Sequence, residues 1–213
     1  MILSPLLLYI GVVLALTFAE YSQDRRAQYL FKPLSAFGFL LLALYYGALE
    51  TSYGVVILCG LLLCALGDLL LLPRDKPKIF TAGVSAFAFG HLLYGFAFMQ
   101  GGFSALGLGL GLLSFLLLAV IFYFFIWPDI PKDMRVSVVT YVGIIGIMVL
   151  GAAIFAHSSN LWTVFGAAIA FAISDVFVAK DRFKARKKWH AFIITPLYFG
   201  AQALFAYSVN LQL

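Results

Sequence analysis

Long apolar runs, separated by short polar or charged segments, make up most of this chain. Eight of these runs contain 17 to 21 residues each, and an α-helix of that length crosses the hydrocarbon core of a bilayer. Backbone groups in hydrocarbon must bond to one another, so a crossing segment is either a helix or part of a closed barrel. Barrel strands alternate polar and apolar residues, whereas these runs are continuously apolar. The predicted helical spans are residues 2–19, 33–49, 55–72, 80–99, 106–126, 136–155, 161–179 and 191–209.

The composition excludes a water-facing globule. Hydrophobic residues account for 64% of the 213 residues and charged residues for 11%, and the mean hydropathy is +1.04. A soluble domain carries about 25% charged residues. The predicted fold class is therefore all-α integral membrane, with eight transmembrane helices in one bundle and a single domain covering residues 1–213. No positive segment precedes the first run, which is long enough to span, so we expect a retained helix there and not a signal peptide.

The basic residues indicate how the bundle is oriented. All 14 Lys and Arg residues fall after the first, third, fifth and seventh spans, and the other loops and both ends contain none. Basic loops stay in the cytoplasm, so we expect both termini outside, in a membrane of the bacterial inner (plasma) type. The net charge of +5 would also attract anionic membrane lipids. Nucleic acid is not an expected partner, because no basic domain lies outside the membrane. The basic residues are Arg25, Arg26, Lys32, Arg74, Lys76, Lys78, Lys132, Arg135, Lys180, Arg182, Lys184, Arg186, Lys187 and Lys188.

A weak internal repeat relates the third and seventh spans. Each carries an aspartate directly after a small residue, Gly67 before Asp68 and Ser174 before Asp175, and the two aspartates are 107 residues apart, half of the chain. Both spans run in the same direction through the membrane. Duplication of a four-helix unit would produce this pattern. The apolar composition that membrane helices share can also make two spans resemble each other.

The two aspartates are the strongest candidates for chemistry. An Asp at the centre of a membrane helix costs roughly 2.5–3.5 kcal/mol on insertion scales, and such residues are usually functional. Asp68 and Asp175 precede the next basic residues by six and five positions, which places them about 7–9 Å inside the membrane. An aspartate is too short to reach water from there, and small residues share both helix faces, so both carboxylates should point into the bundle. Glu20 lies at a similar depth, but its span ends there, and an interfacial contact accounts for it.

Other polar residues within the spans are better explained by helix packing. His91 lies near the middle of the fourth span with Tyr94 one turn later, and Tyr198 and Gln202 are one turn apart in the eighth. Polar side chains commonly bridge membrane helices, so we expect these four to orient the acids or to line a pocket. No second ligand stands at metal-binding distance from the histidine, and no metal site is predicted.

Two inward carboxylates fit more than one activity. In a site poor in water, two nearby acids resist simultaneous ionisation, so one can hold a proton while the other stays charged. That arrangement serves acid–base hydrolysis of an ether or a peptide, and it also serves proton-coupled transport. Transporters typically have broken helices, and the two acid-bearing spans lack internal proline. Intramembrane aspartyl proteases use a Gly-x-Gly-Asp sequence, whereas residues 65–68 read Ala-Leu-Gly-Asp. A structural protein without chemistry also remains possible.

Taken together and in order, the motifs resemble those of the YhhN-like family of membrane lysoplasmalogenases. The resemblance extends from residue 32 to residue 202, and one departure is Val176, where the family pattern has a small polar residue. The matching pieces are Lys32-Pro33, Gly67-Asp68-Leu69-Leu70-Leu71, Gly83…Phe87…Gly90-His91-Leu92-Leu93-Tyr94, Phe171…Ser174-Asp175…Ala179 and Tyr198…Gln202.

The resemblance implies an eight-helix hydrolase that cleaves the vinyl ether bond of lysoplasmalogen. The products would be a fatty aldehyde and glycerophosphocholine or glycerophosphoethanolamine. Asp68 and Asp175 would be the acid–base pair, without a metal or organic cofactor, and Lys32 would contact the lipid phosphate. The supporting residues would be His91, Tyr94, Ser174, Tyr198, Gln202 and Glu20. The implied partners are the lysophospholipid substrate and membrane lipids, with no obligatory protein partner.

Overall fold

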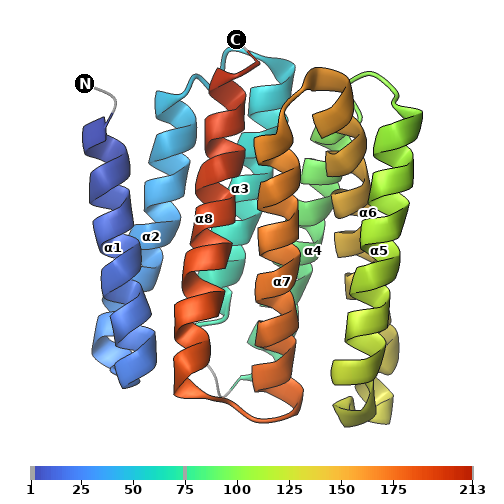
Figure 1. Ribbon diagram of the computed structural model, residues 1–213. Coiled ribbons are helices and arrows are strands. Elements are labelled where there is room, and N and C mark those ends of the chain that lie inside the picture. The colour runs from blue at the N-terminus through green and yellow to red at the C-terminus, as the bar shows by residue number, and fades with distance from the viewer. Residues whose placement is uncertain (1–2, 74–75, 213) are drawn as a thin grey trace.

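Eight antiparallel α-helices form one bundle in the computed structural model, which describes residues 3–73 and 76–212 (Figure 1). All eight are long and apolar enough to cross a membrane, so the prediction of an all-helical membrane protein with eight spans is confirmed. Ile2 and Arg74, which the sequence assigned to the first span and to a basic loop, lie outside the described residues. The helices are α1 (Leu3–Ser22), α2 (Arg25–Tyr45), α3 (Ser52–Leu70), α4 (Pro77–Phe98), α5 (Ala105–Phe125), α6 (Arg135–Ser159), α7 (Trp162–Phe183) and α8 (Ala191–Asn210).

Helix α2 begins earlier than the sequence predicted. Pro33 was expected to open the second span, but it lies inside α2. The helix begins after Asp24, whose side chain accepts hydrogen bonds from the backbone N–H groups of Arg26 (3.0 Å) and Ala27 (3.2 Å). An aspartate in this capping position satisfies donors that have no partner within the helix. The basic residues assigned to the first loop therefore belong to α2.

Helix α7 continues past its predicted end at residue 179. Lys180 and Arg182 lie in its last turn. Cations are favourable there because the carbonyl end of a helix carries partial negative charge. Charged residues were taken to mark the end of the span, but they occupy helical turns that reach beyond the apolar run.

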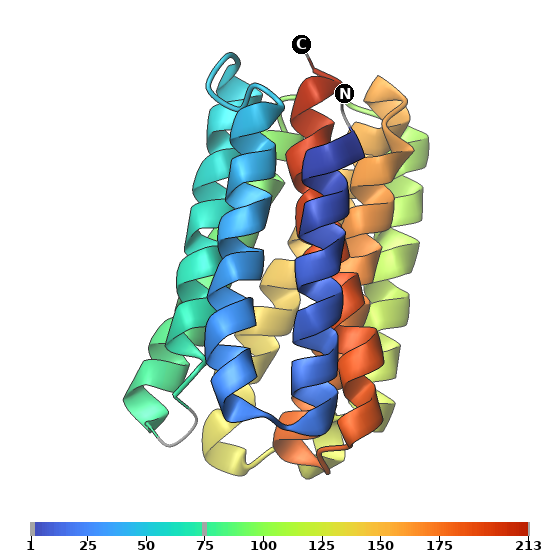
Figure 2. The ribbon, with the colours of Figure 1, turned by 90° about the vertical axis from the view of Figure 1, so that its left-hand side faces the viewer.

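Helix α8 lies near the centre of the bundle, where it packs against α1, α2, α3 and α7 (Figures 1 and 2). Helix α6 packs against α4, α5 and α7, and the close pair α3–α4 joins the two groups. Helix α5 is the least buried of the eight. Its large side chains, such as Leu116 and Phe124, are mostly exposed, as expected for a surface that faces lipid tails.

Two glycines bring α5 close to α6. A Cβ atom at Gly107 would lie 2.7 Å from the Cα atom of Ile154, and one at Gly111 would lie 2.9 Å from the Cα atom of Leu150. Such contacts are too short for any other residue unless the backbone moves. Small residues at one face commonly allow membrane helices to approach this closely.

The two ends of the bundle differ in charge. Both termini lie at one end, at the top of Figure 1, and the connections α1–α2, α3–α4, α5–α6 and α7–α8 lie at the other. The Lys and Arg residues of the described chain lie in those four connections or in the adjoining helical turns. We refer to this end as the basic end.

Candidate active site

Asp68 is buried near the basic end of α3, with only 2% of its surface exposed. The hydroxyl of Tyr198 on α8 donates a hydrogen bond of 2.6 Å to its Oδ2 atom. The ammonium of Lys32 on α2 lies 3.3 Å from its Oδ1 atom. Three helices therefore meet at this carboxylate, and a buried carboxylate requires such partners because burial removes its hydration.

A chain of hydrogen bonds continues from this carboxylate into the bundle. The Gln202 side-chain amide donates to the Tyr198 hydroxyl (3.1 Å) and accepts from the Tyr94 hydroxyl (2.7 Å). All three side chains are buried. The chain links α3, α8 and α4, so three of the four polar residues that the sequence placed in the fourth and eighth spans, Tyr94, Tyr198 and Gln202, meet at one site.

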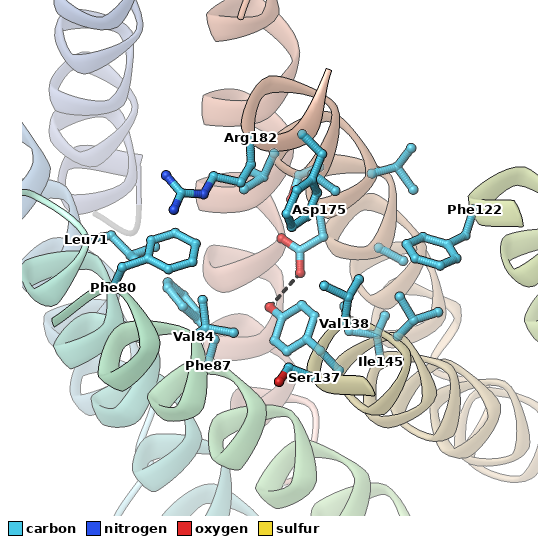
Figure 3. A pocket seen from close by; sticks show the side chains of 18 of the residues that line it. Leu71, Phe80, Val84, Phe87, Phe122, Ser137, Val138, Ile145, Asp175 and Arg182 are labelled. Carbon is cyan, nitrogen blue, oxygen red and sulfur yellow. Dashed lines mark hydrogen bonds between the residues drawn. The ribbon is translucent and has the colours of Figure 1, made fainter. Parts of the chain in front are cut away.

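Asp175 on α7 has simpler surroundings. The Tyr141 hydroxyl on α6 donates a hydrogen bond of 2.8 Å to its Oδ2 atom, drawn as a dashed line in Figure 3. Its other carboxyl oxygen has no hydrogen-bond partner among the residues that the structure describes. The carboxyl group faces into a cavity whose walls are mainly aliphatic and aromatic (Figure 3).

Both aspartates line this same cavity, whose volume is about 390 Å³. A space of that size is typical of sites for small organic ligands. Seven of the eight helices contribute to its wall, and its apolar side chains come chiefly from α4, α6 and α7. Besides Asp68 and Asp175, the lining includes Lys32, Leu71, Phe80, Val84, Phe87, Phe122, Asp133, Ser137, Val138, Tyr141, Ile145, Ser174, Arg182, Ile194 and Tyr198.

The other predicted site residues lie in three different settings. Ser174 lines the cavity wall and donates its hydroxyl hydrogen to the Phe171 carbonyl of its own helix (2.7 Å). Glu20 lies 3.4 Å from the Arg186 guanidinium, in the interfacial setting expected for it. His91 is completely buried and does not line the cavity, and its ring lies edge-to-face against the Phe171 ring at 4.5 Å between centroids.

His91 lies outside the network of hydrogen bonds around Asp68. Neither ring nitrogen makes a hydrogen bond of acceptable geometry in the described part of the chain, although the ring interacts with the backbone of Phe87. Three aromatic rings surround it, those of Tyr94, Tyr141 and Phe171. The histidine therefore packs beside the hydrogen-bonded chain without joining it.

Sequence reasoning missed two residues that contact the charged groups. Tyr141, the partner of Asp175, was not singled out, although a hydroxyl in the half of a span nearest the basic loops is a usable signal. The second is His190, which directly precedes α8: its side chain is buried, and its Nδ1 atom contacts an Asp181 carboxylate oxygen. Among the described residues no group of three His, Cys, Asp or Glu side chains could hold a metal ion.

The fold and the site together define an integral membrane protein with eight helices and a cavity lined by Asp68 and Asp175. More narrowly, the chain belongs to the YhhN family, whose model matches residues 27–209.

Curated relatives support this assignment. The chain is 33% identical over 158 residues to lysoplasmalogenase TMEM86A of Bos taurus, covering 71% of this chain and 64% of that protein. It is also 33% identical over 153 residues to lysoplasmalogenase TMEM86B of Homo sapiens, covering 71% of this chain and 62% of that protein. The matches thus span less than two thirds of the length of these relatives. No solved structure matches the chain.

Proposed function

We propose that this protein is an intramembrane lysoplasmalogenase that hydrolyses the vinyl ether bond of a lysophospholipid. The observation that carries the proposal is that two carboxylates, the buried Asp68 and the partly buried Asp175, line one largely apolar cavity near the basic end. A lipid tail fits an apolar cavity, and paired acids suit hydrolysis. The relatives that bear the name lysoplasmalogenase narrow the substrate class.

The two carboxylates have partners that suit different roles. Lys32 provides a positive charge that favours an ionised Asp68, and an ionised carboxylate can stabilise a developing cation or activate water. The partner of Asp175 is the neutral hydroxyl of Tyr141, and its second oxygen faces the cavity. We therefore assign the proton donor to Asp175 and the electrostatic and basic role to Asp68.

The proposed reaction begins with proton transfer from Asp175 to the alkene carbon farther from the ether oxygen. The remaining carbon–oxygen unit becomes an oxocarbenium ion, which the Asp68 carboxylate stabilises. Water adds to this carbon and gives a proton to the Asp68 carboxylate, forming a hemiacetal. The hemiacetal then collapses: its hydroxyl proton passes to Asp175, and the departing ether oxygen takes the proton from Asp68, which releases the fatty aldehyde and the glycerophosphodiester and restores both acids. One water is consumed, and no oxidant or reductant is required.

The direct test is release of fatty aldehyde from lysoplasmalogen by the purified protein. Asp68→Asn and Asp175→Asn should each reduce kcat by about 10²–10⁴-fold, the usual contribution of a positioned acid or base. Asp129→Asn is a matched control, because Asp129 forms a partly exposed ion pair with Lys184 at 3.5 Å, and such pairs contribute little to stability. Wild-type turnover in both test variants would refute the assignment of the pair.

We also propose that residues 1–213 form one domain whose basic end faces the cytoplasm of a bacterial-type plasma membrane. The concentration of Lys and Arg at that end supports this orientation. Cysteine-labelling from each side of the membrane at positions in the α7–α8 connection and at the opposite end would test it. Labelling of the α7–α8 connection from outside would contradict the proposed topology.

A second candidate function is proton-coupled transport. The chain of hydrogen bonds from Asp68 through Tyr198 and Gln202 to Tyr94 favours it, because such polar chains carry protons in membrane proteins. Solute uptake driven by a pH gradient in proteoliposomes, without aldehyde release, would support transport in place of hydrolysis.

A further inference from the structure

A second cavity of about 300 Å³ adjoins the first at the basic end of the bundle. The two cavities share the side chains of Lys32, Phe80, Arg182 and Tyr198 in their walls. Asp68, which contacts Lys32 and Tyr198, therefore lies beside the wall common to both cavities. The Asp68 carboxylate therefore lies where the two cavities adjoin.

The second cavity differs chemically from the first. Five basic residues line it, against two acidic ones, whereas its neighbour is mainly aliphatic and aromatic. Helix α7, the connection after it, and α2 supply the positive charges. The five basic residues are Lys32, Arg182, Arg186, Lys187 and Lys188, and the two acidic residues are Glu20 and Asp181.

Several of these charges are already engaged with one another. Arg186 lies 3.4 Å from Glu20, and Lys32 lies 3.3 Å from Asp68. Arg182 differs, because its guanidinium lies over the Phe80 ring at 4.2 Å from the centroid. It has no hydrogen-bonded or ion-paired acceptor among the residues that the structure describes. Its donors are thus available to an anion at the boundary between the two cavities.

We propose that this second cavity binds the phosphodiester of the lysophospholipid headgroup, with Arg182 as its principal contact. The inference rests on the proposed function, which supplies the lipid. The planar guanidinium matches the oxygens of a phosphate group. In the substrate, the three glycerol carbons separate the phosphate from the vinyl ether. A phosphate beside Arg182 therefore leaves the ether at the shared wall near Asp68, with the alkenyl chain in the apolar cavity.

Binding of two non-hydrolysable ligands tests this assignment without any need for turnover. The first is a 1-O-alkyl lysophosphatidylethanolamine, and the second is the matching 1-O-alkylglycerol, which lacks the phosphodiester. Equilibrium binding to the purified protein in neutral detergent should favour the first by about tenfold or more, the effect of one charge-assisted hydrogen bond. Arg182→Gln should remove most of this preference and leave alkylglycerol binding unchanged.

A control variant tests whether the preference for the phosphorylated ligand depends on Arg182 itself or on the positive charge of this surface in general. Arg26 is exposed at the same end but does not line either cavity. Arg26→Gln should keep the full preference for the phosphorylated ligand. Equal losses in Arg26→Gln and Arg182→Gln would overturn the proposal, as would equal affinity of the wild-type protein for both ligands.

Two further outcomes separate this inference from the proposed function. Inorganic phosphate alone should bind much more weakly than the lysophospholipid, and equally tight binding would mean a free-anion site and overturn the proposal. If the wild-type protein releases no aldehyde yet shows the Arg182-dependent preference, the phosphodiester site stands and the hydrolase function fails. If it hydrolyses lysoplasmalogen and Arg182→Gln leaves KM unchanged, the hydrolase function stands and the phosphodiester site fails.

Discussion

Asp68 and Asp175 have similar positions in the sequence but very different surroundings in the fold. The first has a cation and a hydroxyl as partners, and it begins a chain of hydrogen bonds across three helices. The second has a single tyrosine hydroxyl and otherwise faces an apolar cavity. The contrast shows that the same side chain, at matching depths in two helices, can have two different electrostatic environments. Each environment then suits a different half of an acid–base reaction.

The largest difference between the two aspartates should appear in the free energy of unfolding when each is replaced by alanine. Asp68→Ala leaves the Lys32 ammonium and the Tyr198 hydroxyl without their partner, so the free energy of unfolding should fall by about 3 kcal/mol. Asp175→Ala removes one hydrogen bond, and the expected loss is about 1 kcal/mol. Chemical unfolding in detergent measures both. Equal losses would show that the two carboxylates are held equally strongly.

Removing the hydroxyl of either tyrosine should have a smaller effect than removing a carboxylate. Comparing kcat with melting temperature in these variants distinguishes a residue that positions a carboxylate from one that also stabilises the fold. Tyr141→Phe removes the only hydrogen bond to Asp175 among the described residues. We expect kcat to fall about tenfold, within the range of one lost hydrogen bond, with little change in melting temperature. Tyr198→Phe interrupts the longer chain and should lower both kcat and melting temperature. A stability loss in Tyr141→Phe as large as in Tyr198→Phe would contradict this division.

The smallest effect should come from His91, which lies beside both carboxylate environments and hydrogen-bonds to neither. Among the described residues, the His91 ring makes no hydrogen bond of acceptable geometry and has a polar interaction only with the Phe87 backbone, so replacing it with an apolar ring removes a desolvation cost. His91→Phe should therefore change the free energy of unfolding by no more than about 1 kcal/mol, in the stabilising direction, with turnover retained. His91→Ala is the companion variant and should destabilise the protein by leaving a cavity. Loss of turnover in His91→Phe would mean that the imidazole takes part in the reaction.

The transmembrane fold could be read from the sequence because it follows from local rules. Continuous apolar runs predict helices in a bilayer, and the basic residues predict which loops share a side. The boundaries were less accurate, since membrane helices extend into the polar interface. Pro33 was predicted to begin the second span because the apolar run begins there. It lies in the helix interior because Asp24 already caps α2 nine residues earlier.

The candidate site could be predicted only in part. The cost of an acid in a membrane helix is enough to single out Asp68 and Asp175, and helical spacing groups Tyr198 with Gln202. The sequence does not show which side chains from other helices will meet them. The hydroxyl of Tyr141, in the half of its span nearest the basic loops, marks it only as a candidate, because the carboxylate that identifies it comes from another helix, α7. Cavities likewise depend on how seven helices pack, which no single segment encodes.

The shared wall between the two cavities has a consequence for the fate of the products. Cleavage of the lysophospholipid at that wall would produce one apolar fragment, the aldehyde, and one polar fragment, the glycerophosphodiester. The aldehyde would remain among the hydrocarbon-like side chains and could pass into the surrounding lipid. The glycerophosphodiester would be left in the charged compartment, next to the aqueous phase. Because the two fragments would diffuse into different solvents, recombination would be rare and each turnover would be effectively one-way.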